Sequence, residues 1–68
     1  MRILGLDPGT ATTGYGIVDV VEGEFTAVTY GVIKTPATMP MPQRLQQIQQ
    51  ELQQLLDEYK PDAVGIEE

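Results

Sequence analysis

The 68-residue sequence contains no cysteine, no histidine and no tryptophan. Without cysteine or histidine the chain has neither disulfides nor the spaced zinc ligands of a zinc finger to stabilise a small core. A chain of this length buries only roughly 60% of the surface that its unfolded form exposes. We therefore expect marginal stability, and any bound metal ion must use oxygen ligands.

Basic residues and long apolar runs are also scarce. Four Lys and Arg stand against ten Asp and Glu, a formal net charge of −6, which is the wrong sign for binding a polyanion through a broad basic face. The N-terminal apolar run, ILGL, has four residues and is too short for a signal peptide or a membrane span. We expect a soluble, cytoplasmic protein. Because the chain stops at Glu67-Glu68, directly after a strand-like run, we interpret it as a fragment.

Runs rich in branched and apolar residues predict four strands. The first, which contains ILGL, is apolar on both faces, as expected of a central strand covered on both sides. Turn chemistry at Glu22-Gly23 joins the second and third strands as a hairpin. The predicted strands are Arg2–Asp7, Gly14–Val21, Glu24–Lys34 and Ala63–Glu67.

A connector and a helix are predicted between the third and fourth strands. Three prolines in TPATMPMP exclude regular structure there. From Pro42 to Tyr59 the apolar residues recur at spacings of three and four, and glutamines fill the opposite, solvated side. Pro61 ends the helix. A helical crossover normally returns the chain parallel to a strand of the same sheet, so we expect the last strand to lie beside the first.

Asp7 and Glu67 each end an apolar strand. An unpaired carboxylate is expensive to bury, and a bound cation would offset that cost. Because side chains alternate along a strand, Gly5 shares a face with Asp7, and Ala63 and Gly65 share a face with Glu67. We expect the helix to pack on this small-residue face and the two carboxylates to emerge side by side at the carboxyl edge of the sheet. Mg²⁺ between them would relieve their repulsion.

Simpler interpretations of these residues remain open. Asp-Pro-Gly commonly begins a turn in which the acid caps local amides, and Glu67 alone is an ordinary solvated residue at a strand end. Threonines after Gly9 form turns or, with nearby amides, meet a phosphate; they are Thr10, Thr12 and Thr13. The aromatic side chains are expected in the core or on sheet faces; they include Tyr15, Phe25 and Tyr30.

The stretch ILGLDPGTATTGYGIV, with an acid on the first strand and TGYG opening the second, resembles the N-terminus of RuvC-type Holliday junction resolvases. KPDAVGIEE resembles the next acidic strand of that family, so the likeness runs from Met1 to Glu68. The resemblance implies an α/β, RNase H-like fold. Residues 1–68 would form the N-terminal part of a single nuclease domain, with three antiparallel strands, a helix, and a fourth strand parallel to the first.

The same resemblance implies a Mg²⁺-dependent endonuclease that acts as a homodimer and cuts four-way DNA junctions in recombination and repair. It implies two Mg²⁺ ions per active site and the RuvA-RuvB branch-migration complex as a partner. Asp7 and Glu67 match two acids that the family uses as metal ligands and catalytic residues. Two further family acids lie on a late helix to which nothing here corresponds, so we expect the 68-residue chain itself to cleave nothing.

Three other interpretations share parts of the pattern. ATPases of the actin, Hsp70 and sugar-kinase type place a phosphate loop after the first strand, similar to Asp7–Thr13. Nucleases of the YqgF type, which process ribosomal RNA precursors, have a similar DPG opening. The final Ile-Glu argues against the first class, and TGYG argues against the second. A non-enzymatic interpretation is a half-domain whose uncovered sheet face and open edge lead to self-association.

Overall fold

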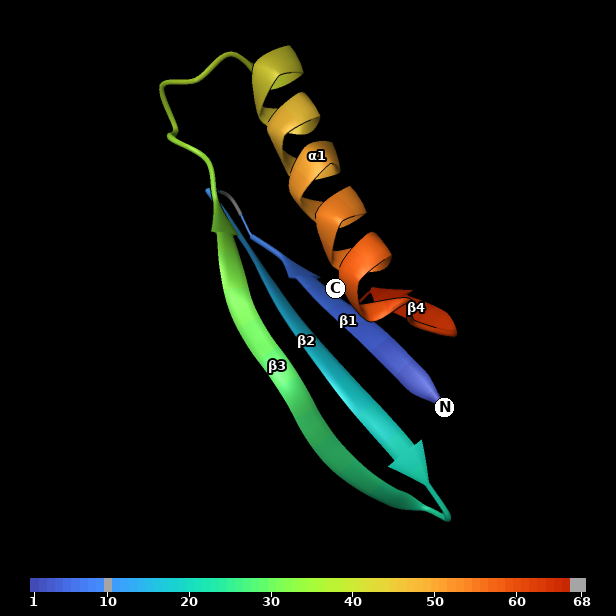
Figure 1. Cartoon of the computed structure of the whole chain (residues 1–68). Coiled ribbons are helices and arrows are strands. Elements are labelled where there is room, and N and C mark those ends of the chain that lie inside the picture. Colours follow the sequence, from blue (N-terminus) through green and yellow to red (C-terminus); the bar gives the residue numbers. More distant parts are fainter. Residues whose placement is uncertain (10, 67–68) are drawn as a thin grey trace.

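The computed structural model describes residues 1–9 and 11–66, and its elements follow the predicted order (Figure 1). The elements are β1 (Arg2–Pro8), β2 (Thr12–Val21), β3 (Glu24–Lys34), α1 (Met41–Tyr59) and β4 (Ala63–Ile66). β2 begins two residues earlier than expected because Thr12 and Thr13 already pair with Lys34 and Ile33 of β3. The predicted last residue of the fourth strand, Glu67, lies outside the described residues.

The four strands form one mixed sheet in the order β3-β2-β1-β4. β2 runs antiparallel to both β1 and β3, and β4 runs parallel to β1. The hairpin turn is also as predicted: Glu22 and Gly23 have φ angles of 53° and 80°, since the favoured two-residue hairpin turn needs positive φ at both positions. Both the hairpin and the parallel crossover of the prediction are confirmed.

α1 has defined ends. Pro40 precedes its first turn, and Pro42 lies within that turn, where a missing N–H costs nothing. At the other end Lys60 adopts the left-handed conformation, with φ of 49°, and donates its N–H to the Leu56 carbonyl at 2.9 Å. Pro61 then prevents the helix from continuing. Within residues 1–9 and 11–66, no helix combines the length and the hydropathy needed to cross a membrane.

α1 lies over one face of the sheet (Figure 1). The buried side chains show that it is the face opposite to the predicted one. Leu4 of β1 and Ile17 of β2 are paired neighbours on the covered face, 1% and 0% exposed. A small cavity between this face and the helix is lined by residues that include Ile33 and Leu55. The expectation that α1 packs against Gly5, Ala63 and Gly65 is therefore wrong. Large aliphatic side chains bury more apolar area under a helix than glycine and alanine can, and this area decides the face.

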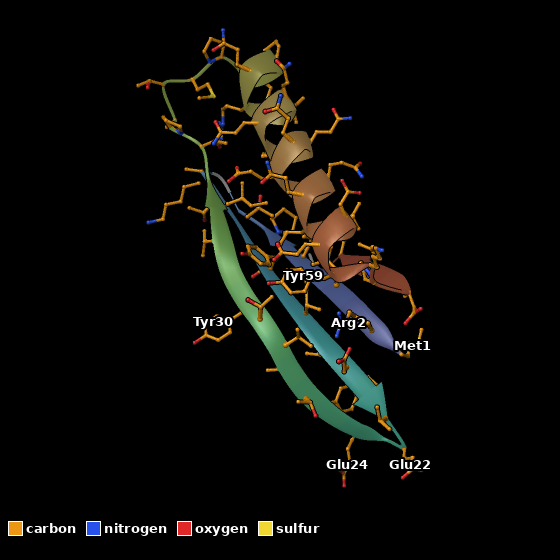
Figure 2. All side chains as sticks on the ribbon, in the orientation of Figure 1. Met1, Arg2, Glu22, Glu24, Tyr30 and Tyr59 are labelled. Atoms are coloured by element: carbon orange, nitrogen blue, oxygen red, sulfur yellow. The ribbon has the colours of Figure 1, made fainter. Side chains whose placement is uncertain are left out.

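The other face of the sheet is not covered by any element of the described chain. Three apolar side chains of β3 are exposed there: Phe25 by 73%, Tyr30 by 84% and Val32 by 54%. Figure 2 shows Tyr30 projecting from β3 away from α1. Within the described chain, Phe25 and Tyr30 are thus exposed aromatics on a sheet face. The uncovered face is the one that the half-domain interpretation requires, and self-association through it stays a prediction.

Candidate functional site

Asp7 lies near the end of β1, opposite Gly14 of β2, and its side chain is exposed. Its carboxylate makes no hydrogen bond or ion pair with any other described residue. Burial therefore imposes no cost here, contrary to the expectation drawn from the sequence. The carboxylate caps no amide among residues 1–9 and 11–66. The Thr10 amide, which a turn beginning at Asp7 could also present to it, lies outside the described residues, so the capping interpretation stays open.

A hollow of about 430 Å³ opens on the uncovered face beside Asp7. It exists because Gly5, Gly14 and Gly16 leave this face of the sheet without side chains. A Cβ built on Gly16 would meet nothing within 4 Å. The hollow is lined by Ile3, Gly5, Leu6, Asp7, Gly14, Tyr15, Gly16, Val18 and Gly31. An exposed carboxylate without partners among the described residues, next to open space, leaves room for a hydrated cation.

The register between β1 and β4 determines what can lie next to Asp7. The pairs run from Ile3 with Ala63 to Leu6 with Ile66, so Gly5 faces Gly65. The two small-residue faces therefore coincide, which is the condition for the expected pair of carboxylates. The register is described as far as Ile66, and Glu67, the second predicted ligand, lies outside the described residues. Among residues 1–9 and 11–66 no group of three or more acidic, histidine or cysteine side chains is arranged to hold a metal ion.

The turn after β1 offers little to a phosphate. The Gly9 N–H donates to the Thr12 carbonyl at 2.7 Å and is not free for a ligand. A Cβ on Gly9 would lie 2.9 Å from that same carbonyl oxygen, so the tight turn requires glycine. Thr13 is 9% exposed and lies on the face under α1. Thr10 lies outside the described residues. The described part of Asp7–Thr13 thus provides no support for the phosphate loop of an ATPase.

A charged cluster at the opposite end of β1 was not predicted from the sequence. The Arg2 guanidinium donates two hydrogen bonds to Asp19, from Nε to Oδ1 at 2.8 Å and from Nη2 to Oδ2 at 3.0 Å. Its Nη1 donates to the Tyr59 carbonyl at 3.0 Å, and Figure 2 shows Arg2 and Tyr59 close together at the C-terminal end of α1. The hydrogen bonds from Arg2 to Asp19 lower the pKa of the Asp19 carboxyl and raise the pKa of Arg2.

Comparison with known proteins decides the family. The family model "Crossover junction endodeoxyribonuclease RuvC" matches residues 3–68. The chain belongs to the RuvC family. Crossover junction endodeoxyribonuclease RuvC of Syntrophomonas wolfei is 62% identical over 68 residues, and that of Alkaliphilus metalliredigens is 53% identical over 68 residues. The match covers 100% of this chain but 40% and 42% of those two proteins.

A solved structure agrees with this assignment. The structure "T. thermophilus RuvC in complex with Holliday junction substrate" superposes with a TM-score of 0.90 at 29% sequence identity, and the match covers 100% of this chain and 44% of that one. The predicted RNase H-like arrangement, with β4 parallel to β1, is thereby confirmed. Neither the ATPase nor the YqgF-type alternative gains support from the family match.

Proposed function

We propose that the protein to which residues 1–68 belong is a Mg²⁺-dependent endonuclease that cleaves four-way DNA junctions. In this proposal the chain supplies two metal-binding and catalytic carboxylates, Asp7 and Glu67. Membership of the RuvC family supports the reaction. The observation that carries the site is the parallel register of β1 and β4: Leu6 pairs with Ile66, and the next residue in each segment is an acid.

The donor set fits Mg²⁺. This ion takes oxygen ligands and typically binds one or two carboxylates while keeping several waters and accepting substrate phosphates. Asp7 offers such an oxygen donor, exposed and without a partner among the described residues. The hollow beside it has a volume of about 430 Å³, enough for waters and a phosphate group.

The contribution of these residues to catalysis would be to hold the metal ion and to orient it. Asp7 and Glu67 would fix the cation at the carboxyl edge of the sheet, and the pairing of β1 with β4 would set their spacing. Mg²⁺ held by these carboxylates would supply an activated water and neutralise charge on the phosphate. With water activated in this way, residues 1–68 need not supply a histidine base, and they contain no histidine.

Other parts of the proposal rest on the family alone. They are the homodimer, the RuvA-RuvB partner, the role in recombination and repair, and the cytoplasmic location. The net charge of −6 repels a DNA backbone, since phosphate contacts are made mainly by Lys and Arg. We therefore propose that most DNA contacts of the whole protein come from residues beyond these 68.

Paramagnetic broadening by Mn²⁺, an ion with the same preference for oxygen ligands, tests the site directly. In the ¹⁵N-labelled chain we expect Mn²⁺ to broaden the amide signals of Asp7 and Gly14 selectively. In the Asp7→Asn and Glu67→Gln variants we expect this selective broadening to be lost. Glu68→Gln is the matched control, because it removes an equal charge from the neighbouring residue. Equal effects of the variants at 67 and 68, or no broadening around Asp7, would refute the proposed site.

A further inference from the structure

Within the described chain, β4 is a short strand at one side of the sheet, and its own side chains do little there to fix its position. It has four residues, pairs with β1 alone among the described strands, and exposes Val64 by 52% and Ile66 by 66%. A shift of one residue in the pairing of a strand moves its side chains to the opposite face, and strands with few buried side chains specify their register weakly. Within these residues, contacts other than those of Val64 and Ile66 must therefore select the register that pairs Gly5 with Gly65.

Arg2, the first residue of β1, makes contacts that can select the register of β4. Asp62 precedes β4 directly, and it is bonded to Arg2 in both directions: the Arg2 N–H donates to Asp62 Oδ2 at 2.7 Å, and the Asp62 N–H donates to the Arg2 carbonyl at 2.7 Å. A shift of β4 by one residue in either direction would break both bonds. The carboxylate of Asp62 thus marks the one register in which it meets the Arg2 amide.

The side chain of Arg2 also fixes the position of the segment that connects the end of α1 to Asp62. Its guanidinium holds the Tyr59 carbonyl at 3.0 Å, one of the carbonyls at the end of a helix that lack an internal partner. The two parallel hydrogen bonds to Asp19, here called the fork, hold the same guanidinium on β2 at 2.8 and 3.0 Å. Only Lys60 and Pro61 separate Tyr59 from Asp62. The end of α1 and the start of β4 are therefore both tied to Arg2.

We propose that Arg2 and Asp62 form a register clamp that positions β4 on β1 and thereby aligns residue 67 with Asp7. This inference rests on the proposed metal site. Arg2 lies five residues from Asp7, roughly 16 Å at about 3.3 Å per residue, which is too far for it to contact a metal ion held by Asp7. It is a positioning residue that acts through the strand pairing. The positive guanidinium at the negative end of the α1 dipole adds to the same contact.

Variants separate the clamp from general stability. Arg2→Met removes the fork but keeps an apolar stem, and Asp62→Ala removes the acceptor of the Arg2 amide. Asp62→Asn is the conservative rescue, because its side-chain oxygen still accepts from that amide. Ile17→Val is the control for stability, because it shortens a fully buried side chain that takes no part in the hydrogen bonds of the clamp.

Two measurements on the 68-residue chain follow. Cross-strand nuclear Overhauser effects between β1 and β4 report the register, with Gly5 and Gly65 as the diagnostic pair. Mn²⁺ titration reports the affinity at Asp7. We expect Arg2→Met and Asp62→Ala to lose the Gly5–Gly65 contact and to bind Mn²⁺ about 10- to 100-fold more weakly, the usual effect of removing a residue that holds ligands in place. Asp62→Asn and Ile17→Val should retain both signals.

The outcomes distinguish the two proposals. Unchanged register and Mn²⁺ affinity in Arg2→Met and Asp62→Ala would overturn the clamp and leave the metal site standing. Absence of Mn²⁺ binding in the unsubstituted chain would overturn the metal site, while loss of the Gly5–Gly65 contact in the two variants would still support the clamp. Global unfolding of both variants, with Ile17→Val folded, would show that these residues hold the fold and not the register, and would overturn the clamp.

Discussion

Substitution of Gly31 by alanine should destabilise the chain, although alanine normally suits a strand better than glycine. Gly31 of β3 pairs with Tyr15 of β2, and the phenol ring lies across it. A Cβ at position 31 would lie 2.5 Å from the Tyr15 Oη, 2.7 Å from Cζ and 3.0 Å from Cε2. The ring must therefore move, and overpacking of this kind typically costs about 1–3 kcal/mol. At about 0.05–0.15 kcal/mol per residue, this is a large part of the total stability.

Urea unfolding followed by circular dichroism measures this cost. Gly16→Ala is the matched control, since a Cβ there meets nothing within 4 Å and should be neutral or stabilising by about 0.5–1 kcal/mol, the usual gain over glycine in a strand. In a Tyr15→Leu background, which lacks all three contacting atoms, Gly31→Ala should lose most of its penalty. Equal stability of the two glycine variants, or an undiminished penalty in the Tyr15→Leu background, would refute the described packing.

The hydrogen bonds from Arg2 lower the pKa of the Asp19 carboxyl from the ordinary 3.8. The stability that ionised Asp19 contributes is therefore complete above pH 3.8, and it disappears as the pH falls through the lower pKa of the folded state. Asp19→Asn should flatten this part of the acid-unfolding curve, and identical curves for the variant and the unsubstituted chain would contradict this prediction. Ile17→Ala should cost about 2–5 kcal/mol and Val18→Ala clearly less, because the two side chains lie on opposite faces; equal costs in chemical unfolding would show that α1 does not cover the Ile17 face. The 68-residue chain, incubated with a synthetic four-way junction and Mg²⁺, should produce no nicks on a denaturing gel, and symmetric nicks would contradict this expectation.

The elements were predictable wherever one strong local pattern governs them. Apolar spacing of three and four between Leu45 and Tyr59 predicts α1, and the pair Glu22-Gly23 suits a two-residue hairpin turn. The parallel pairing of β4 with β1 follows from the general behaviour of helical crossovers. Each of these features depends on a short segment and on rules that hold for most sheets.

The side of the sheet that α1 covers was not predictable from β1 alone. One face of β1 carries Ile3 and Gly5, and the other carries Leu4 and Leu6, so both are apolar. The covered face is decided by the apolar side chains that β2 adds to it, above all Ile17, which is completely buried beside Leu4. That contribution depends on the register between strands, which local sequence patterns do not specify.

The candidate site was predictable in part for the same reason. Asp7 stands out because an acid ends an apolar strand, and the structure places it at the edge of an open hollow. The contacts of Arg2 with Asp19 and Asp62 did not stand out, since these residues are 17 and 60 positions away in sequence and come together only through strand pairing. A search for opposite charges at paired strand positions could have found the contact with Asp19 once the hairpin register was known.

Crystals of the chain grown with Mn²⁺ and measured at the manganese absorption edge would test the central claim most directly. We predict an anomalous peak at the carboxyl edge of the sheet with oxygens of both Asp7 and Glu67 at coordination distance, about 2.1 Å for an ion of this kind. A peak bound by only one of the two carboxylates, or carboxylates on opposite faces of the sheet, would contradict the account.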